Sequence, residues 1–130
     1  MTGISHMPER PPRVAVGYPD DVAGRGELPN QIARLVSRAL RDARDAGLSR
    51  ADVAAGLSRE LGRKITESTL EGWASEADTA HRIPLDAFAA LVKVTGIVDL
   101  LGFLPGLSGF VVVPSKYMAV IELQLLEEFE

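Results

Sequence analysis

Basic side chains gather in one part of the sequence, between residues 34 and 64. This block holds eight basic and four acidic residues, a net charge of +4, whereas residues 65–130 carry −7. Guanidinium and ammonium groups at this density are candidates for binding an anionic partner. The alternative interpretation is that the arginines decorate a solvated helix face. The charge of the whole chain, −4, argues against indiscriminate binding to nucleic acid.

The sequence offers little for catalysis or metal binding. It has no cysteine and two histidines, His6 and His81, which excludes disulfides, thiolate ligands and a cysteine nucleophile. It contains no phosphate-binding Gly-x-x-x-x-Gly-Lys-Ser/Thr loop, no His-Glu-x-x-His pair and no nucleophile elbow. We therefore expect neither an enzyme nor a protein with a cofactor or metal ion. For His81 we favour a structural hydrogen bond.

The hydrophobic pattern predicts the helices that position the charged residues. Apolar residues recur at helical spacing from 32 to 43, and Gly47 is the natural stop. A second helix is predicted to begin at Ser49, with Asp52 completing a capping box, and to end at Gly62.

A third helix follows the pair Arg63-Lys64. Thr66 or Ser68 begins it, and Ser68 with Glu71 forms the better capping box. Its inward residues are predicted to be Leu70, Trp73, Ala74 and Ala77. A fourth helix begins with Pro84 at its first position and ends at Gly96. Its buried stripe is predicted to be Leu85, Phe88, Leu91 and Val92.

The rest of the sequence predicts a short apolar helix at 97–104, a β-strand at 110–113 and a last helix from Ser115. The fold class is therefore mainly α: a bundle of five to six helices with one short C-terminal strand. Residues 1–29, rich in Pro and Gly, are expected to form a flexible arm, of which 1–7 resemble a cloning junction. Residues 30–107 form the main domain. No signal peptide or membrane span is recognised, so we expect a cytoplasmic protein without a membrane partner.

The C-terminal extension, residues 108–130, is predicted to make a homodimer. One strand leaves its hydrogen-bonding edges open, so we expect it to pair with a copy of itself or with another segment. Pairing with the same strand of a second chain would create a two-fold axis. The last helix, with Met118, Ile121, Leu125 and Phe129 on one side, would then cover the pair. Packing of this helix on the chain's own core is the alternative.

Residues 48–104 resemble the helix-turn-helix domain of the Cro and phage-repressor class. Residues 49–54 look like its first motif helix, 65–70 like the start of its recognition helix, and 83–96 like its packing helix. A closer resemblance, over residues 28–130, is to small helix-turn-helix proteins of Mu-like transposable phages and prophages. The more specific parts of this resemblance are Trp73 and the His81-Arg82-x-Pro84 spacing.

The resemblance implies sequence-specific binding of double-stranded DNA by a phage- or prophage-type transcriptional regulator. The third helix would meet base edges, and basic residues around it would hold phosphates. The candidate DNA contacts are Arg50, Arg63, Lys64, Thr66, Glu67, Ser68, Thr69, Glu71, Ser75 and Arg82.

Two features depart from the family. The connector at 58–64 is longer than the tight family turn, and the third helix carries acids and no basic residue. Carboxylates accept hydrogen bonds from cytosine N4, yet they repel phosphate. The alternative function is therefore a protein-interaction module, with a phage or host protein as partner, that keeps the fold without touching DNA.

Overall fold

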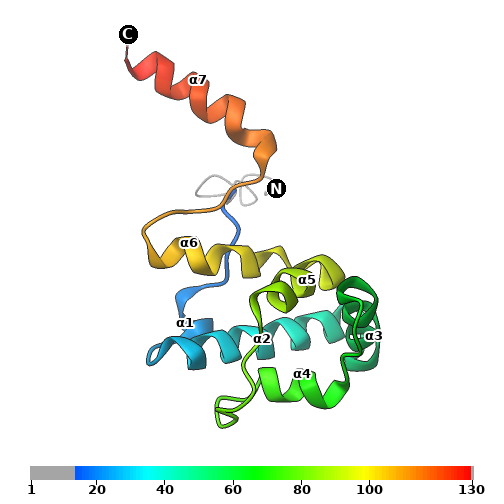
Figure 1. Ribbon diagram of the computed structural model, residues 1–130. Coiled ribbons are helices and arrows are strands. Elements are labelled where there is room, and N and C mark those ends of the chain that lie inside the picture. Colours follow the sequence, from blue (N-terminus) through cyan, green and yellow to red (C-terminus); the bar gives the residue numbers. More distant parts are fainter. Residues whose placement is uncertain (1–13, 130) are drawn as a thin grey trace, which may run out of the picture.

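The computed structural model describes residues 14–129. Within them the chain forms seven α-helices and two 3-10 helices, and Figure 1 shows α2 to α5 packed into one helical body. The α-helices are α1 (Asp20–Ala23), α2 (Leu28–Asp45), α3 (Arg50–Leu61), α4 (Glu67–Trp73), α5 (Leu85–Thr95), α6 (Phe103–Leu107) and α7 (Met118–Glu128). The mainly helical class is confirmed. Since α1 lies in the segment expected to be an arm, the helices outnumber the predicted five to six.

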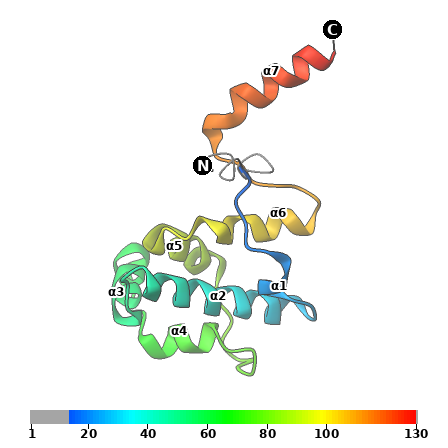
Figure 2. The same cartoon turned by 180° about the vertical axis from the view of Figure 1, so that it is seen from behind.

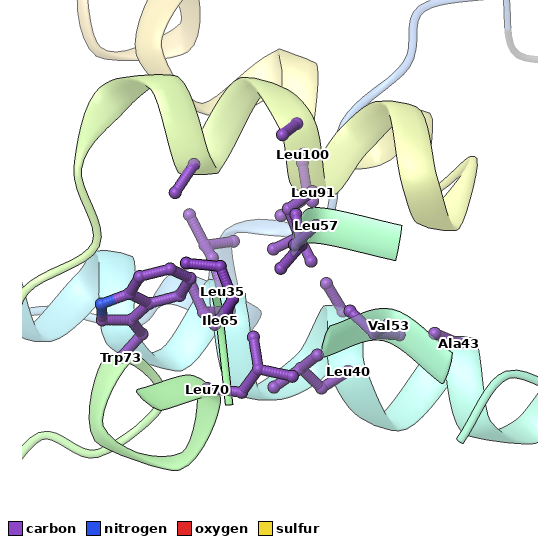
Figure 3. Close-up of a cluster of buried hydrophobic side chains, with 14 of the residues drawn as sticks. Leu35, Leu40, Ala43, Val53, Leu57, Ile65, Leu70, Trp73, Leu91 and Leu100 are labelled. Atoms are coloured by element: carbon purple, nitrogen blue, oxygen red, sulfur yellow. The ribbon is translucent and has the colours of Figure 1, made fainter. Parts of the chain in front are cut away.

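The long helix α2 is the centre of the core. Its apolar positions recur every three or four residues, so one side is covered on all its turns. Its buried residues are Ala33, Leu35, Val36, Ala39, Leu40 and Ala43. Figure 3 shows Leu35 and Leu40 meeting Val53 and Leu57 from α3 and Leu70 and Trp73 from α4. This cluster holds α4 at the surface of the body in a fixed place.

Helices α3 and α5 pack closely against each other. Gly56 of α3 is buried at the crossing, and a Cβ placed on it would lie 2.6 Å from Val94 Cγ1 of α5. Glycine therefore allows the two helices to approach more closely than any larger residue would. The helix ends predicted at Gly62 and Gly96 are confirmed, because both adopt left-handed conformations there.

Residues 14–29 are packed on the helical body, which corrects the expectation of a flexible arm for this part of 1–29. The Tyr18 hydroxyl donates a hydrogen bond of 2.7 Å to Asp42 Oδ2 on α2. A Cβ on Gly102 would lie 2.6 Å from the Val16 carbonyl oxygen, so the segment crosses the 3-10 helix Val98–Gly102 in direct backbone contact. Ala23 of α1 is buried against α2. Residues 1–13 lie outside the described part of the chain.

The predicted strand at 110–113 is not formed. Val112 makes a single antiparallel bridge to Val16, with Val16 N–H donating to the Val112 carbonyl at 2.8 Å. A ladder does not continue because Phe110 N–H, which would face residue 18, donates instead to the Pro105 carbonyl at 3.0 Å, and Pro114, which would face residue 14, has no N–H. The chain thus pairs this segment with its own N-terminal part, and the described residues contain no β-strand.

Two burial predictions are also wrong. Leu85, placed on the buried stripe of α5, is 72% exposed, because α5 packs on α3 through the side that carries Ala87, Ala90 and Leu91. Ala77 is exposed because α4 ends at Trp73 and Ala77 lies in the loop beyond it. The short apolar helix predicted at 97–104 is a 3-10 helix followed by α6, which continues through Pro105 to Leu107.

Helix α7 projects from the helical body. Figures 1 and 2, seen from opposite sides, both show it with no other helix beside it, at the end of the molecule opposite α4. Every described residue from 118 to 129 is exposed. None of the helices in residues 14–129 combines the length and the apolar character needed to cross a membrane.

Candidate nucleic-acid interface

A capping box fixes the start of α3 and with it the position of Arg50. Asp52 N–H donates to Ser49 Oγ at 3.1 Å, and Ser49 N–H donates to Asp52 Oδ2 at 3.0 Å, as the sequence predicted. These hydrogen bonds from the backbone and side chain of Ser49 lower the pKa of Asp52. Arg50 is the first residue of the helix. Its backbone is therefore held at the end of α3 that faces α4.

A hydroxyl from α3 fixes the connector to α4. Ser58 Oγ donates to the Ala54 carbonyl at 2.8 Å and accepts from Ile65 N–H at 2.8 Å. The left-handed Gly62 reverses the chain, and Ile65 enters the core. These hydrogen bonds of Ser58 fix the conformation of the long connector at 58–64. Sequence analysis missed the role of Ser58, since a serine inside a predicted helix gives no sign of which backbone group it will bind.

Thr66 is the N-cap of α4, so the preference for Ser68 with Glu71 as the capping box is wrong. Thr66 Oγ1 accepts from Thr69 N–H at 3.1 Å. Ser68 is then the second residue of the helix and is exposed. Thr66 itself has the extended backbone of an N-cap residue (φ −102°, ψ 165°), and Ile65 just before it is buried.

The two faces of α4 differ sharply in chemistry. Leu70 is fully buried and Trp73 is 6% exposed, so the prediction that Trp73 belongs to the core is confirmed. The outward face carries hydroxyl and carboxylate groups: Thr66, Glu67, Ser68 and Glu71 are exposed, and Thr69 is partly buried with its hydroxyl 3.0 Å from that of Thr66. Of the sequence-predicted contacts, these five lie together on one surface. We call them the α4 face.

Two arginines beside the α4 face are paired with carboxylates. Arg50 Nη1 forms an ion pair with Glu71 Oε1. Arg63 binds Asp86, the second residue of α5, through both terminal nitrogens at 3.1 and 3.4 Å, which lowers the pKa of Asp86. Lys64 is exposed and makes no ion pair with the described residues. All these pairs are solvent-accessible, so each is weak and can open when a stronger anion approaches.

The last two candidate residues lie apart from the α4 face. Ser75 is partly buried in the loop after α4. Arg82 is partly buried too, and its Nη2 lies 3.5 Å from Asn30 Oδ1 on α2. Arg82 Nη1 is buried and has no hydrogen-bond partner among residues 14–129. Between them, Asp78 accepts from the backbone N–H of His81 and contacts its ring at 3.0 Å, which is the structural hydrogen bond expected for His81.

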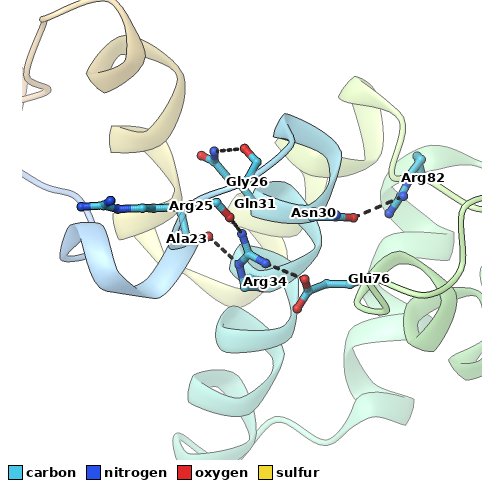
Figure 4. A network of polar contacts seen from close by, with 8 residues as sticks. All are labelled: Ala23, Arg25, Gly26, Asn30, Gln31, Arg34, Glu76 and Arg82. Carbon is cyan, nitrogen blue, oxygen red and sulfur yellow. Dashed lines mark hydrogen bonds and ion pairs between the residues drawn. The ribbon is translucent and has the colours of Figure 1, made fainter.

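Arg34, the first arginine of the basic block, has a structural role. Arg34 of α2 donates from Nε to the Ala23 carbonyl at 2.5 Å and pairs through Nη1 with Glu76 at 2.5 Å, while Nη2 contacts the Arg25 carbonyl. Figure 4 shows this side chain between the end of α1 and the loop after α4. Arg34 belongs to the basic block that is a candidate for binding an anion, but three partners occupy its guanidinium.

In the described part of the chain, no group of three or more His, Cys, Asp or Glu side chains is placed to hold a metal ion. In comparisons with known proteins, no protein-family model, no curated protein and no solved structure matches the chain.

Proposed function

We propose that the protein binds double-stranded DNA through α3 and α4, used as a helix-turn-helix, and acts as a phage- or prophage-type transcriptional regulator. The observation that carries the proposal is the α4 face with Arg50, Arg63 and Lys64 at its edge. Polar groups that can hydrogen-bond base edges lie on one exposed helix start, and cations that can bind phosphates lie around it.

The short α4 suits such a contact. Seven residues span about 10 Å at 1.5 Å per residue, comparable with the width of the major groove. In helix-turn-helix proteins the N-terminal residues of the second helix meet the bases. Here these residues are Glu67 and Ser68, with Glu71 one turn further on.

The carboxylates of Glu67 and Glu71 determine which base the α4 face would recognise. An exposed carboxylate accepts from the N4 amino group of cytosine. When DNA binds, Arg50 exchanges Glu71 for a phosphate, which leaves Glu71 free to accept a hydrogen bond. We therefore expect a preference for cytosine at the positions facing Glu67 and Glu71.

Selection from a random duplex pool tests this proposal. The full chain should enrich duplexes that share a cytosine-containing motif. Glu67→Gln and Glu71→Gln should each relax the preference at one position, because an amide presents a donor as well as an acceptor. Glu27→Gln, at the exposed start of α2, is the matched control and should leave the motif unchanged. Failure to enrich any duplex at low salt would overturn the proposal.

The acidic character of the α4 face favours a second candidate, a module that binds a protein instead of DNA. A basic protein surface would meet Glu67 and Glu71 without the phosphate repulsion that DNA brings. A protein partner whose complex survives Arg63→Ala with Lys64→Ala, but is lost with Glu67→Lys, would favour this alternative.

A further inference from the structure

Helix α7 is apolar on almost all its sides. Its exposed large hydrophobic residues include Met118, Val120, Ile121, Leu123, Leu125 and Leu126. A helix that is hydrophobic all round is stable when it is buried between other elements. An isolated helix of 11 residues is also marginal in water. The sequence of α7 therefore calls for a partner surface, and residues 14–129 of this copy do not supply one.

The helical body has an apolar groove of about 340 Å³ between α5 and the segment that ends in α6. Leu85 and Phe88 of α5 line one side, and Leu101 and Leu104 line the other. Leu85 is 72% exposed there and Leu104 48%. The groove exposes part of the apolar stripe of α5 that the sequence pattern predicts to be buried.

The charges of α7 and of the groove are complementary. The polar residues of α7 are acidic, Glu122, Glu127 and Glu128, together with Gln124. Lys93 lines the groove, and its contact with Glu60 at 2.7 Å is exposed and exchangeable. Two α7 helices placed side by side would bring acids together, whereas α7 in the groove brings acids to a lysine.

The path of the chain before α7 carries this helix away from the groove of the same copy. The bridge between Val16 and Val112 holds the chain just before Pro114, and α7 then leaves the body (Figures 1 and 2). We propose that α7 of each copy docks in the α5–α6 groove of a second copy, giving a two-fold dimer by reciprocal exchange. This replaces pairing through the strand that is not formed. It leaves α4, at the opposite end of the body, free.

Sedimentation of the full chain, without DNA, tests the proposal. The chain should sediment as a dimer, and both Leu85→Glu in the groove and Ile121→Glu on α7 should give monomers. These positions are exposed, so circular dichroism should show unchanged folding of both variants. A mixture of the two variants should dimerise at concentrations where neither does alone, because one intact helix and one intact groove meet in the mixed pair.

Each other occupant of the groove predicts a different result. If α7 pairs with α7, Leu85→Glu stays dimeric and the mixture gains nothing. If α7 folds onto its own groove, or if both surfaces bind a different protein, the full chain is a monomer. Any of these results overturns the proposal, and none of them depends on whether α4 binds DNA.

Discussion

The guanidinium of Arg50, at the start of α3, forms an ion pair with the carboxylate of Glu71 on α4. A residue suited to a phosphate and a residue suited to a base edge thus neutralise each other in the free protein. An exposed pair of this kind contributes about 0–1 kcal/mol to stability. It can therefore open at little cost when DNA offers each group a better partner.

Arg50→Ala should weaken binding to duplex DNA and reduce the slope of log K against log salt by about one, since one phosphate contact is lost. Thermal stability should change little, because the pair is exposed. Fluorescence anisotropy at several salt concentrations measures the slope. Lys116→Ala, which removes a cation near α7, is the control. An unchanged slope in Arg50→Ala would show that Arg50 stays on Glu71 in the complex.

Trp73→Ala should destabilise the fold by about 3–5 kcal/mol, because it empties the space between α4 and α2. Trp73 is the chain's one tryptophan, so urea unfolding should be followed by circular dichroism. Glu67→Ala, on the exposed side of the same helix, should change stability by no more than about 0.5 kcal/mol. A Trp73→Ala variant of unchanged stability would refute its assignment to the core.

Gly56→Ala should destabilise the protein even though alanine favours a helix by about 1 kcal/mol over glycine. The added methyl would lie 2.6 Å from Val94 Cγ1, and overpacking costs about 1–3 kcal/mol. Val94→Ala should relieve the clash, so the double variant should be more stable than the sum of the two single changes allows. Additive effects in urea unfolding would show that α3 and α5 are not in this close contact.

The pKa of Tyr18 should lie above 10, the ordinary value for tyrosine. Burial raises this pKa, and so does the hydrogen bond that the phenol donates to Asp42. A raised pKa in the folded state means that the contribution to stability is fully present below about pH 10 and is lost as the pH rises through the folded-state pKa. The difference in absorbance at tyrosinate wavelengths between the chain and Tyr18→Phe isolates this titration. A midpoint at or below 10 would show that the segment is not bound to α2.

Local signals in the sequence predicted most of the helical body. Gly62 and Gly96 end helices in left-handed conformations, and Ser49 with Asp52 makes the capping box, because these effects involve residues a few positions apart. The failures involve distant partners. Residues 14–29 were expected to be flexible because their contacts with Asp42 and Gly102 are not visible in the local sequence. The strand predicted at 110–113 would have needed several residues of another segment to pair with it, and only Val16 does so.

In the candidate site, too, local features could be predicted from the sequence and contacts between distant elements could not. The five residues of the α4 face lie together because local helix geometry places them on one side of α4, while Leu70 between them faces the core. The sequence alone left open that Arg50 meets Glu71, that Arg63 meets Asp86 and that Arg34 is fully occupied, since each pair joins different elements. The periodicity of α5 predicts Leu85 to be buried, because an apolar stripe at helical spacing does not show which of its residues the rest of the chain will cover.

The salt dependence of duplex binding shows whether α3 and α4 bind DNA with Arg50, Arg63 and Lys64 on phosphates. The full chain should bind a random duplex pool at low salt, and log K should fall linearly with log salt with a slope of about −3 for each subunit. Arg63→Ala with Lys64→Ala should reduce that slope by about two across all sequences. No binding at low salt, or the same slope in the double variant, would contradict the account.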